Sequence, residues 1–156
     1  MEKRKRIALV AHDNCKRDLV EWVDWNWKLL LGHQLICTGT TGRLVEEALL
    51  RKLDRELPAR PEILKLKSGP FGGDQQLGAM IAEGRVDVLI FFWDPMQPHP
   101  HDVDVKALLR ISVLYNIPTA CNRSTADFLI SSQLMEEEYA PVIREFDEYL
   151  GREVEL

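Results

Sequence analysis

Residues suited to acid–base chemistry and to anion binding gather in one stretch of the chain, 67–104. Its first part, Ser68–Asp74, follows an apolar run and is rich in glycine, which lets a backbone turn sharply and approach a bound anion closely. In open α/β sheets, ligands bind just beyond the carboxyl ends of buried strands, so polar residues at such a place predict a ligand site. The residues that follow the buried run Val86–Trp93 are Asp94, His99, His101, Asp102 and Asp104.

The elements that must position these residues are five apolar runs that alternate with helical patterns. The runs are 7–11, 35–37, 63–66, 86–93 and 117–120. This alternation predicts one α/β domain over residues 1–156, a doubly wound (Rossmann- or flavodoxin-like) fold whose five-stranded parallel sheet has helices on both faces. We expect residues 1–6 to form a solvated basic tail and residues 135–156 an acidic C-terminal helix.

Two of the loops that follow the predicted strands have the composition of phosphate cradles. Besides Ser68–Asp74, Thr38–Gly42 carries glycines and hydroxyl groups ahead of a helix, whose free N–H groups and dipole favour an anion. Lys16, one helical turn beyond the first loop, supplies a positive charge. Neither a P-loop nor a GxGxxG pattern is present. The plainer interpretation, that the threonines and Asp74 simply cap helices, therefore stays open.

Composition argues against several classes of protein. With 156 residues, 46% of them hydrophobic, the chain is long enough to bury a core without disulfides or metal. A net charge of -5 argues against binding to nucleic acid, because phosphate contacts need a basic face. No apolar run is long enough to cross a membrane. Three scattered cysteines without CxxC spacing are typical of a reducing cytoplasm.

A metal site is an alternative use of the same loops. Nitrogen and oxygen donors on adjacent loops suit a transition metal, and they are His12, His99, His101, Asp102 and Asp104. However, the HxH spacing lies in a loop and lacks a helix-borne pair of ligands that would fix the geometry. A metal-dependent hydrolase that uses the loop from His99 to Asp104 remains an alternative.

Five motifs, in this order, closely resemble the methylglyoxal synthase family. They are VAHDNCK (10–16), TGTTG (38–42), SGPFGGDQQLGA (68–79), DVLIFFWDP (87–95) and PHDVDVKALLR (100–110). The resemblance covers nearly the whole chain. It implies a lyase that converts dihydroxyacetone phosphate to methylglyoxal and inorganic phosphate through an enediolate, without cofactor or metal. It also implies a homo-oligomer, expected to be a hexamer, that inorganic phosphate inhibits.

The resemblance assigns roles at the reacting end of the substrate. Asp74 is expected to be the base and general acid, with Asp104 close by, and His101 is expected to polarise the carbonyl group. A second carboxylate near Asp74 would raise the affinity of the pair for a proton. His12 is expected at the hydroxyl end of the substrate.

The resemblance also assigns a phosphate site and its supports. The expected phosphate-binding residues are Lys16, Thr38, Gly39, Thr40, Thr41, Ser68 and Gly69. Asp13 and Asp94 match motif positions and are expected to support the site. Arg152 is the candidate for an arginine that reaches the phosphate region of a neighbouring subunit. The connection Asp54–Glu62 is longer than we expect for the family.

A second alternative is a non-catalytic module of the same fold that senses a phosphate ligand, as in the regulatory domain of carbamoyl phosphate synthetase. Such a module would keep the phosphate cradle without the chemistry. Because Asp74, His101 and Asp104 are all present, the sequence favours the enzyme.

Overall fold

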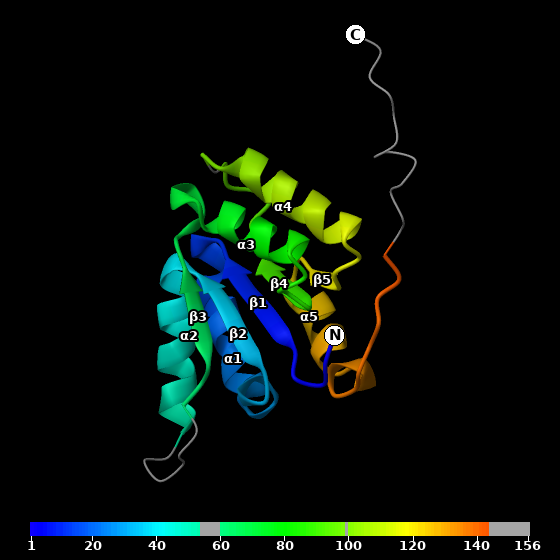
Figure 1. Ribbon diagram of the computed structural model, residues 1–156. Coiled ribbons are helices and arrows are strands. Elements are labelled where there is room, and N and C mark those ends of the chain that lie inside the picture. Colours follow the sequence, from blue (N-terminus) through cyan, green and yellow to red (C-terminus); the bar gives the residue numbers. More distant parts are fainter. Residues whose placement is uncertain (54–59, 99, 144–156) are drawn as a thin grey trace.

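Five parallel strands form one sheet in the order β3-β2-β1-β4-β5 (Figure 1). This is a computed structural model, and it describes residues 1–53, 60–98 and 100–143. The strands are β1 (Arg6–Ala11), β2 (Gln34–Thr38), β3 (Ile63–Leu66), β4 (Val88–Phe92) and β5 (Thr119–Ala120). The predicted fold class is confirmed. The order of strands reverses between β1 and β4, so the loops after these two strands flank the crevice in which this type of sheet binds ligands.

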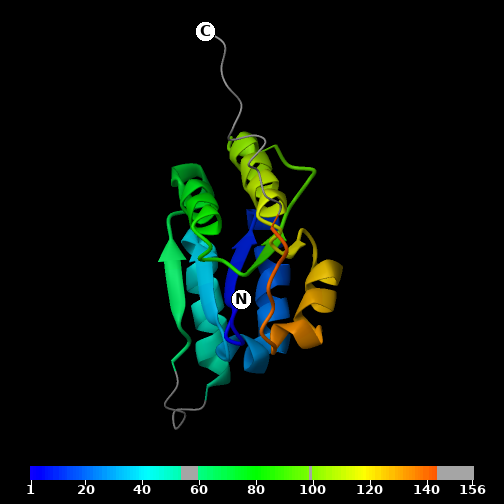
Figure 2. The same cartoon turned by 45° about the vertical axis from the view of Figure 1, so that its right-hand side comes forward.

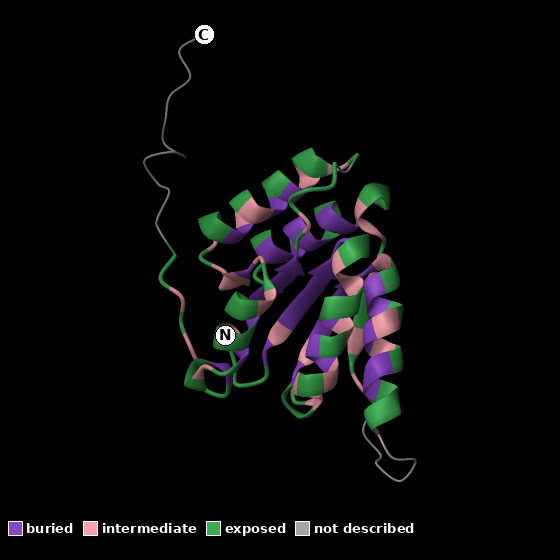
Figure 3. Ribbon diagram, turned by 180° about the vertical axis from the view of Figure 1, so that it is seen from behind, coloured by how far each residue is buried: buried purple, intermediate pink, exposed green. Residues whose placement is uncertain are grey.

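Helices cover both faces of the sheet (Figures 1 and 2). The helices are α1 (Lys16–Leu31), α2 (Gly39–Lys52), α3 (Gly73–Ala82), α4 (Asp102–Leu114) and α5 (Arg123–Ile130). Alternate residues of β1 join two separate cores: Ile7 and Leu9 pack with α1, α2 and α5, whereas Ala8 and Val10 pack with α3 and α4. Burial is therefore continuous through the sheet and along the inner faces of the helices (Figure 3).

The N-terminal segment is less solvated than the sequence predicts. Lys5 is buried, and its ammonium donates hydrogen bonds to the backbone oxygens of Glu2 and Glu137. Arg6 already belongs to β1, where its guanidinium and backbone N–H bind the buried Asp87. The prediction of a solvated tail is therefore wrong for these two residues, because Lys5 binds two backbone oxygens and Arg6 binds the buried Asp87.

The described part of the predicted C-terminal helix is not helical. A short 3-10 helix, Gln133–Met135, is followed by a segment with neither helix nor strand up to Ile143. Long-range hydrogen bonds hold this segment: the Tyr139 N–H donates to the Met1 oxygen, and the Asn116 side chain donates to the Val142 oxygen. The remainder, residues 144–156, lies outside the described residues, as do residues 54–59 of the connection Asp54–Glu62.

Within the described residues, no helix is both long and apolar enough to span a membrane. Two further 3-10 turns lie in loops at the carboxyl edge of the sheet, Asp13–Cys15 after β1 and Gly69–Phe71 after β3. Together with the start of α2 and the loop after β4, these turns bring residues that are far apart in sequence to one place.

Candidate active site

A pocket of about 210 Å³ opens at the carboxyl edge of the sheet, beside the reversal of strand order. It is smaller than the pockets of about 300–1,000 Å³ that bind drug-sized ligands, so a small ligand fits it best. Eleven of the residues predicted from the sequence line it, namely His12, Asp13, Lys16, Thr38, Gly39, Thr40, Thr41, Ser68, Gly69, Asp74 and His101. Asp104 and Asp94 do not line it, and Arg152 lies outside the described residues.

Asp74 lies in the first turn of α3, directly after a sharp turn of the backbone. Gly72 has a φ of 96°, in the left-handed region that favours glycine. A Cβ atom on Gly73 would lie 2.1 Å from the Lys67 oxygen, so the backbone passes too closely for any side chain. Asp74 makes no capping hydrogen bond, and its side chain is buried. The interpretation of Asp74 as a simple helix cap is therefore wrong.

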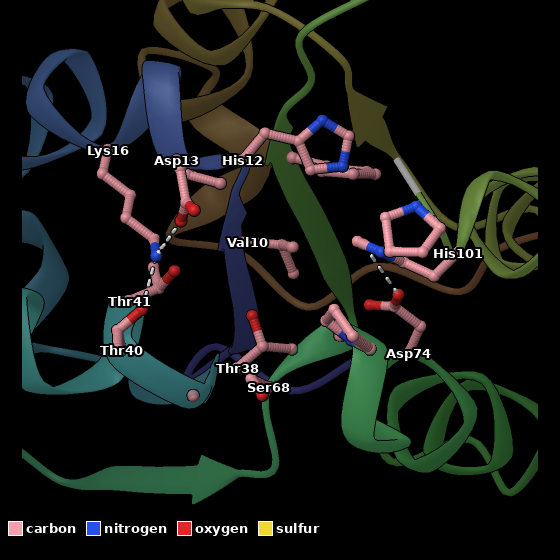
Figure 4. A pocket seen from close by; sticks show the side chains of 16 residues that line it. Val10, His12, Asp13, Lys16, Thr38, Thr40, Thr41, Ser68, Asp74 and His101 are labelled. Carbon is pink, nitrogen blue, oxygen red and sulfur yellow. Dashed lines mark hydrogen bonds and ion pairs between the residues drawn. The ribbon is translucent and has the colours of Figure 1, made fainter. Parts of the chain in front are cut away.

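The carboxylate of Asp74 faces His101 at one end of the pocket (Figure 4). Asp74 Oδ2 lies 3.7 Å from His101 Nε2, which is longer than a hydrogen bond. This buried oxygen has no hydrogen-bond partner among the described residues. Such an atom is costly to bury, and an acid left in this state is typical of a site that handles protons.

Burial raises the pKa of Asp74, and the nearby Asp104 raises it further, whereas His101 opposes both effects. Asp104 does not line the pocket. It lines an apolar groove between α3 and α4, and Asp74 lines this groove as well. The two carboxylates are thus close together, as predicted, and the charge of Asp104 raises the pKa of Asp74 from outside the pocket.

Gly69 keeps the space between Asp74 and His101 open. A Cβ atom at this position would lie 2.9 Å from Asp74 Oδ2 and 2.9 Å from His101 Nε2. Any side chain here would occupy the place that a reacting atom needs in order to touch both groups. A backbone without a side chain therefore forms this wall of the pocket.

The opposite end of the pocket is built from the start of α2 and from Lys16 (Figure 4). Thr38 is the N-cap residue of α2 but makes no capping hydrogen bond with its side chain. The first backbone N–H groups of a helix lack partners within that helix and attract anions. The Lys16 ammonium donates hydrogen bonds to Asp13 Oδ1, at 2.5 Å, and to Thr40 Oγ1. A cation, hydroxyls and a helix N-terminus thus meet at one point.

Gly39 has a structural role that the sequence did not indicate. Its φ is +38°, and a Cβ atom would lie 2.6 Å from Ser68 Cβ. Its N–H donates to the Lys67 oxygen at 3.1 Å, so this donor joins the loops after β2 and β3. Close approach of these two loops brings Ser68 to the same wall as Thr38.

His12 joins the loop after β1 to the loop after β4. Its Nδ1 accepts a hydrogen bond from the Asp94 backbone N–H at 3.2 Å, so the proton of the neutral ring lies on Nε2. The ring packs edge-on against Phe91 and His101, with centroids 5.1 and 5.7 Å away. Asp94 therefore supports the pocket indirectly, because its backbone N–H orients the ring of His12.

Sequence reasoning missed the apolar part of the pocket lining, which is Val10, Ala11, Pro70, Phe91 and Pro100. The alternation of strand residues was the available signal, because the last residues of a strand that face one layer border the crevice. His99, a ligand in the alternative of a metal site, lies outside the described residues. Within residues 1–53, 60–98 and 100–143, no three His, Cys, Asp or Glu side chains are grouped to hold a metal ion.

Three kinds of comparison with known proteins find similarity to the same family. Residues 19–121 match the family model of the MGS-like domain. The chain is 57% identical to a methylglyoxal synthase of Maridesulfovibrio salexigens, over 99% of this chain and 100% of that protein. It is 55% identical to a methylglyoxal synthase of Oleidesulfovibrio alaskensis, over 97% of each chain. A crystal structure of methylglyoxal synthase from Elizabethkingia anophelis superposes with a TM-score of 0.86 at 50% identity, covering 99% of this chain and 95% of the other.

Proposed function

The chain belongs to the methylglyoxal synthase family, and from this premise we propose how its pocket converts dihydroxyacetone phosphate to methylglyoxal and inorganic phosphate. The reaction is a carbon–oxygen bond cleavage by a lyase. A base removes a proton from the carbon next to the ketone, the resulting enediolate expels the phosphate group, and the remaining enol becomes methylglyoxal. The site must therefore supply a base, a donor to the enediolate oxygen, and an anion site.

Asp74 is the base in this proposal, and its environment is the observation that carries the assignment. Its carboxylate is buried, lacks a hydrogen bond among the described residues and faces an open space beside Gly69. Burial and Asp104 raise the pKa of Asp74. A carboxyl group with a raised pKa is a stronger base than an ordinary aspartate, which suits a group that first takes a proton and later returns it as general acid.

The imidazole rings of His101 and His12 stabilise the oxygens of the enediolate. His101 Nε2 lies on the same side of the pocket as Asp74 Oδ2, 3.7 Å away, so one substrate can contact both. The proton on His12 Nε2, fixed by the Asp94 N–H, makes this ring a donor for the hydroxyl end of the substrate. Donors that are held in place before reaction favour the transition state more than the bound substrate.

Lys16 and the N-terminus of α2 hold the phosphate group. Lys16 already contacts the Asp13 carboxylate and Thr40, so the cradle holds an anion beside its cation before a substrate arrives. A phosphate group would displace that carboxylate and take over the ammonium. With the phosphate at this end and the proton transfer at the other, the substrate spans the pocket.

The orientation of the phosphate decides between isomerisation and elimination. An enediolate expels phosphate when the carbon–oxygen bond to the phosphate stands perpendicular to the enediolate plane. A cradle that holds the phosphate out of this plane therefore selects phosphate release.

Finer features follow from the same premise and belong to the proposal. We infer that inorganic phosphate, which is the product, also acts as an allosteric inhibitor. We infer a cytoplasmic homo-oligomer, with a hexamer as the expected state, in which Arg152 reaches a neighbouring site. No cofactor, metal, nucleic acid or membrane takes part.

The test is to mix the purified chain with dihydroxyacetone phosphate and to follow phosphate release and trapped methylglyoxal together, with and without a chelator. Equal amounts of both products, insensitive to chelator, are expected. Loss of activity with chelator would instead support a metal-dependent hydrolase. Binding of the phosphate ester without either product would support a phosphate-sensing module and would overturn the roles of Asp74 and His101.

A further inference from the structure

The side chain of Asn14 connects the two loops that meet at the reversal of strand order. Asn14 belongs to the 3-10 turn after β1, between the pocket residues Asp13 and Lys16. Its Nδ2 donates to Asp94 Oδ2 at 2.8 Å and to Gln97 Oε1 at 2.9 Å. Both acceptors lie in the connection between β4 and α4, so the amide uses both of its N–H groups on one loop.

The acceptor Asp94 makes further hydrogen bonds with both its side chain and its backbone. Its Oδ1 accepts from the Met96 backbone N–H at 2.9 Å, which folds the loop back on itself. Its own backbone N–H donates to His12 Nδ1. Asn14 therefore holds the side chain of Asp94 while His12 accepts from its backbone N–H, and a shift of Asp94 would move the donor that orients the His12 ring.

The same loop leads directly into His101. Strand β4 ends at Phe92 and α4 begins at Asp102, so His101 stands at the last position of the connection. Connections of this kind are mobile unless their backbone or side chains are bound. A bond from an amide to a carboxylate is charge-assisted and stronger than a neutral one, so Asn14 is well suited to fix the loop.

We propose that Asn14 is a positioning residue for the reaction, which holds the connection between β4 and α4 against the loop after β1 and thereby places His12 and His101. Asn14 does not line the pocket and touches no reacting atom in this proposal. The inference rests on the proposed function, and it adds a residue to which neither the family resemblance nor the pocket lining assigns a role.

Asn14→Ala tests the proposal without adding charge. It removes both hydrogen bonds and leaves Lys16, Thr38 and Ser68 in place. We expect kcat to fall by roughly ten- to a hundredfold, because small displacements of catalytic groups cost this much, while KM and inhibition by inorganic phosphate stay within about threefold. Asn14 is exposed, so the variant should fold, which thermal unfolding checks. A wild-type kcat for this variant would overturn the proposal.

An exchange of the two partners tests the contact itself. Asn14→Asp places two carboxylates face to face and should lower kcat at least as much as Asn14→Ala. In the background of Asp94→Asn the same change should be harmless or beneficial. There the new amide at position 94 donates to the new carboxylate, while its oxygen still accepts from Met96. An equal loss from Asn14→Asp in both backgrounds would overturn the proposal.

The control is Asn26→Asp, the same chemical change on α1. Asn26 Nδ2 donates to the Trp22 oxygen, about 15 Å further along the helix than Lys16, and kcat should not change. The wild-type chain is measured first. If it forms no methylglyoxal, the proposed function fails and the positioning role falls with it. If the wild-type chain is active and Asn14→Ala equally so, the positioning role alone fails.

Discussion

At the scale of single residues, Asp74 combines two properties that rarely occur together in a stable protein. It is a buried acid, and its Oδ2 has no hydrogen bond within the described residues. Replacing one oxygen by an amide nitrogen keeps the shape of the side chain and removes its ability to take a proton. The variant Asp74→Asn therefore separates chemistry from binding.

We expect Asp74→Asn to lower kcat by about a thousandfold or more, the order that a general base contributes, while affinity for inorganic phosphate persists. Phosphate affinity should persist because Lys16 and Thr40 form the other end of the pocket. Turnover by trapped methylglyoxal and phosphate binding by calorimetry measure the two effects. Asp102→Asn, at an exposed acid in the first turn of α4, is the matched control. Near-normal turnover of Asp74→Asn would refute the role of base.

The same variant should be more stable than the wild type at neutral pH. Burial raises the pKa of Asp74 above its value in the unfolded chain, so the folded state binds the proton more tightly. The stability linked to this group is fully present below the unfolded pKa and is lost as the pH rises through the folded pKa. At pH 7 the charged group therefore destabilises the fold, and an amide should add about 1 kcal/mol to the free energy of unfolding.

Urea unfolding at pH 7 and near pH 4 measures this effect, and the difference between Asp74→Asn and the wild type should shrink at the lower pH. A variant that is less stable than the wild type at pH 7 would show that the ionised carboxylate is stabilised by contacts, contrary to a group prepared to accept a proton.

Much of the site was predictable from residue type and loop position. Lys16, Thr38 and His101 were expected near one another because each follows a strand whose carboxyl end reaches the same edge, whereas their individual roles came from the resemblance to the family. Asn14 was not assigned a role, because the proposed role depends on where its side chain points. It lies in a 3-10 turn, which has no helix or strand period from which that direction could be predicted. Gly39 was assigned to phosphate, whereas its N–H bonds to the Lys67 oxygen, a contact between loops that sequence spacing does not show.

At the scale of elements, one ion pair fixes the amino end of β1 against the chain just before β4. Arg6 binds Asp87 through Nε, a terminal guanidinium nitrogen and the backbone N–H, at 2.8–3.0 Å. Burial alone would raise the pKa of Asp87, but these bonds from Arg6 outweigh burial and lower it. Because β1 and β4 flank the pocket at their other ends, this contact also aligns the two strands that carry His12 and Asp94.

Arg6→Met should lower the free energy of unfolding by about 2 kcal/mol at pH 7. This is less than the 3–5 kcal/mol of a fully buried pair, because the Arg6 side chain is 35% exposed. The pKa of Asp87 is lowered on folding, so its contribution is present above the unfolded pKa and is lost as the pH falls through the folded pKa. The difference from the wild type should therefore disappear in acid.

Urea unfolding of both proteins at pH 7 and near pH 2.5 measures this difference. Arg85→Met is the control, because Arg85 and Glu83 are both more than half exposed, and it should change stability by less than about 0.5 kcal/mol. Equal stability of Arg6→Met and the wild type at pH 7 would show that the pair does not hold the strands together.

Helices and strands followed their local patterns where no long-range contact competed. Gly84, with a φ of +67°, follows the end of α3, where glycine favours such a stop. The apolar run Val86–Trp93 predicted too long a strand, because Asp87 turns to Arg6 and Trp93 already lies partly exposed beyond β4. Residues 136–143 form no helix despite an acidic helical pattern, because Lys5 binds the Glu137 oxygen and so ties the segment to the amino end.

At the scale of the whole molecule, several large apolar side chains face solvent in the single chain. Trp25, Phe71, Val113 and Phe128 are each 78–81% exposed. Single exposed apolar residues are common, but side chains of this size on separate elements suit a protein that buries them against other copies of itself. We therefore expect light scattering to give an oligomer, with a mass of about six times 18.0 kDa for the hexamer. A monomeric mass would remove any role for Arg152 in a neighbouring site.

Mixing two inactive variants tests that role directly. Arg152→Ala should impair every site if each site borrows this arginine, and Asp74→Asn should inactivate every site from within. In a mixed oligomer, an Asp74→Asn subunit still has Arg152. It can supply this arginine to a neighbouring Arg152→Ala subunit, which still has Asp74. Dissociating, mixing and reassembling the two proteins should therefore restore turnover well above the sum of the separate activities. If each arginine served its own site, no subunit of the mixture would be complete and no turnover would return.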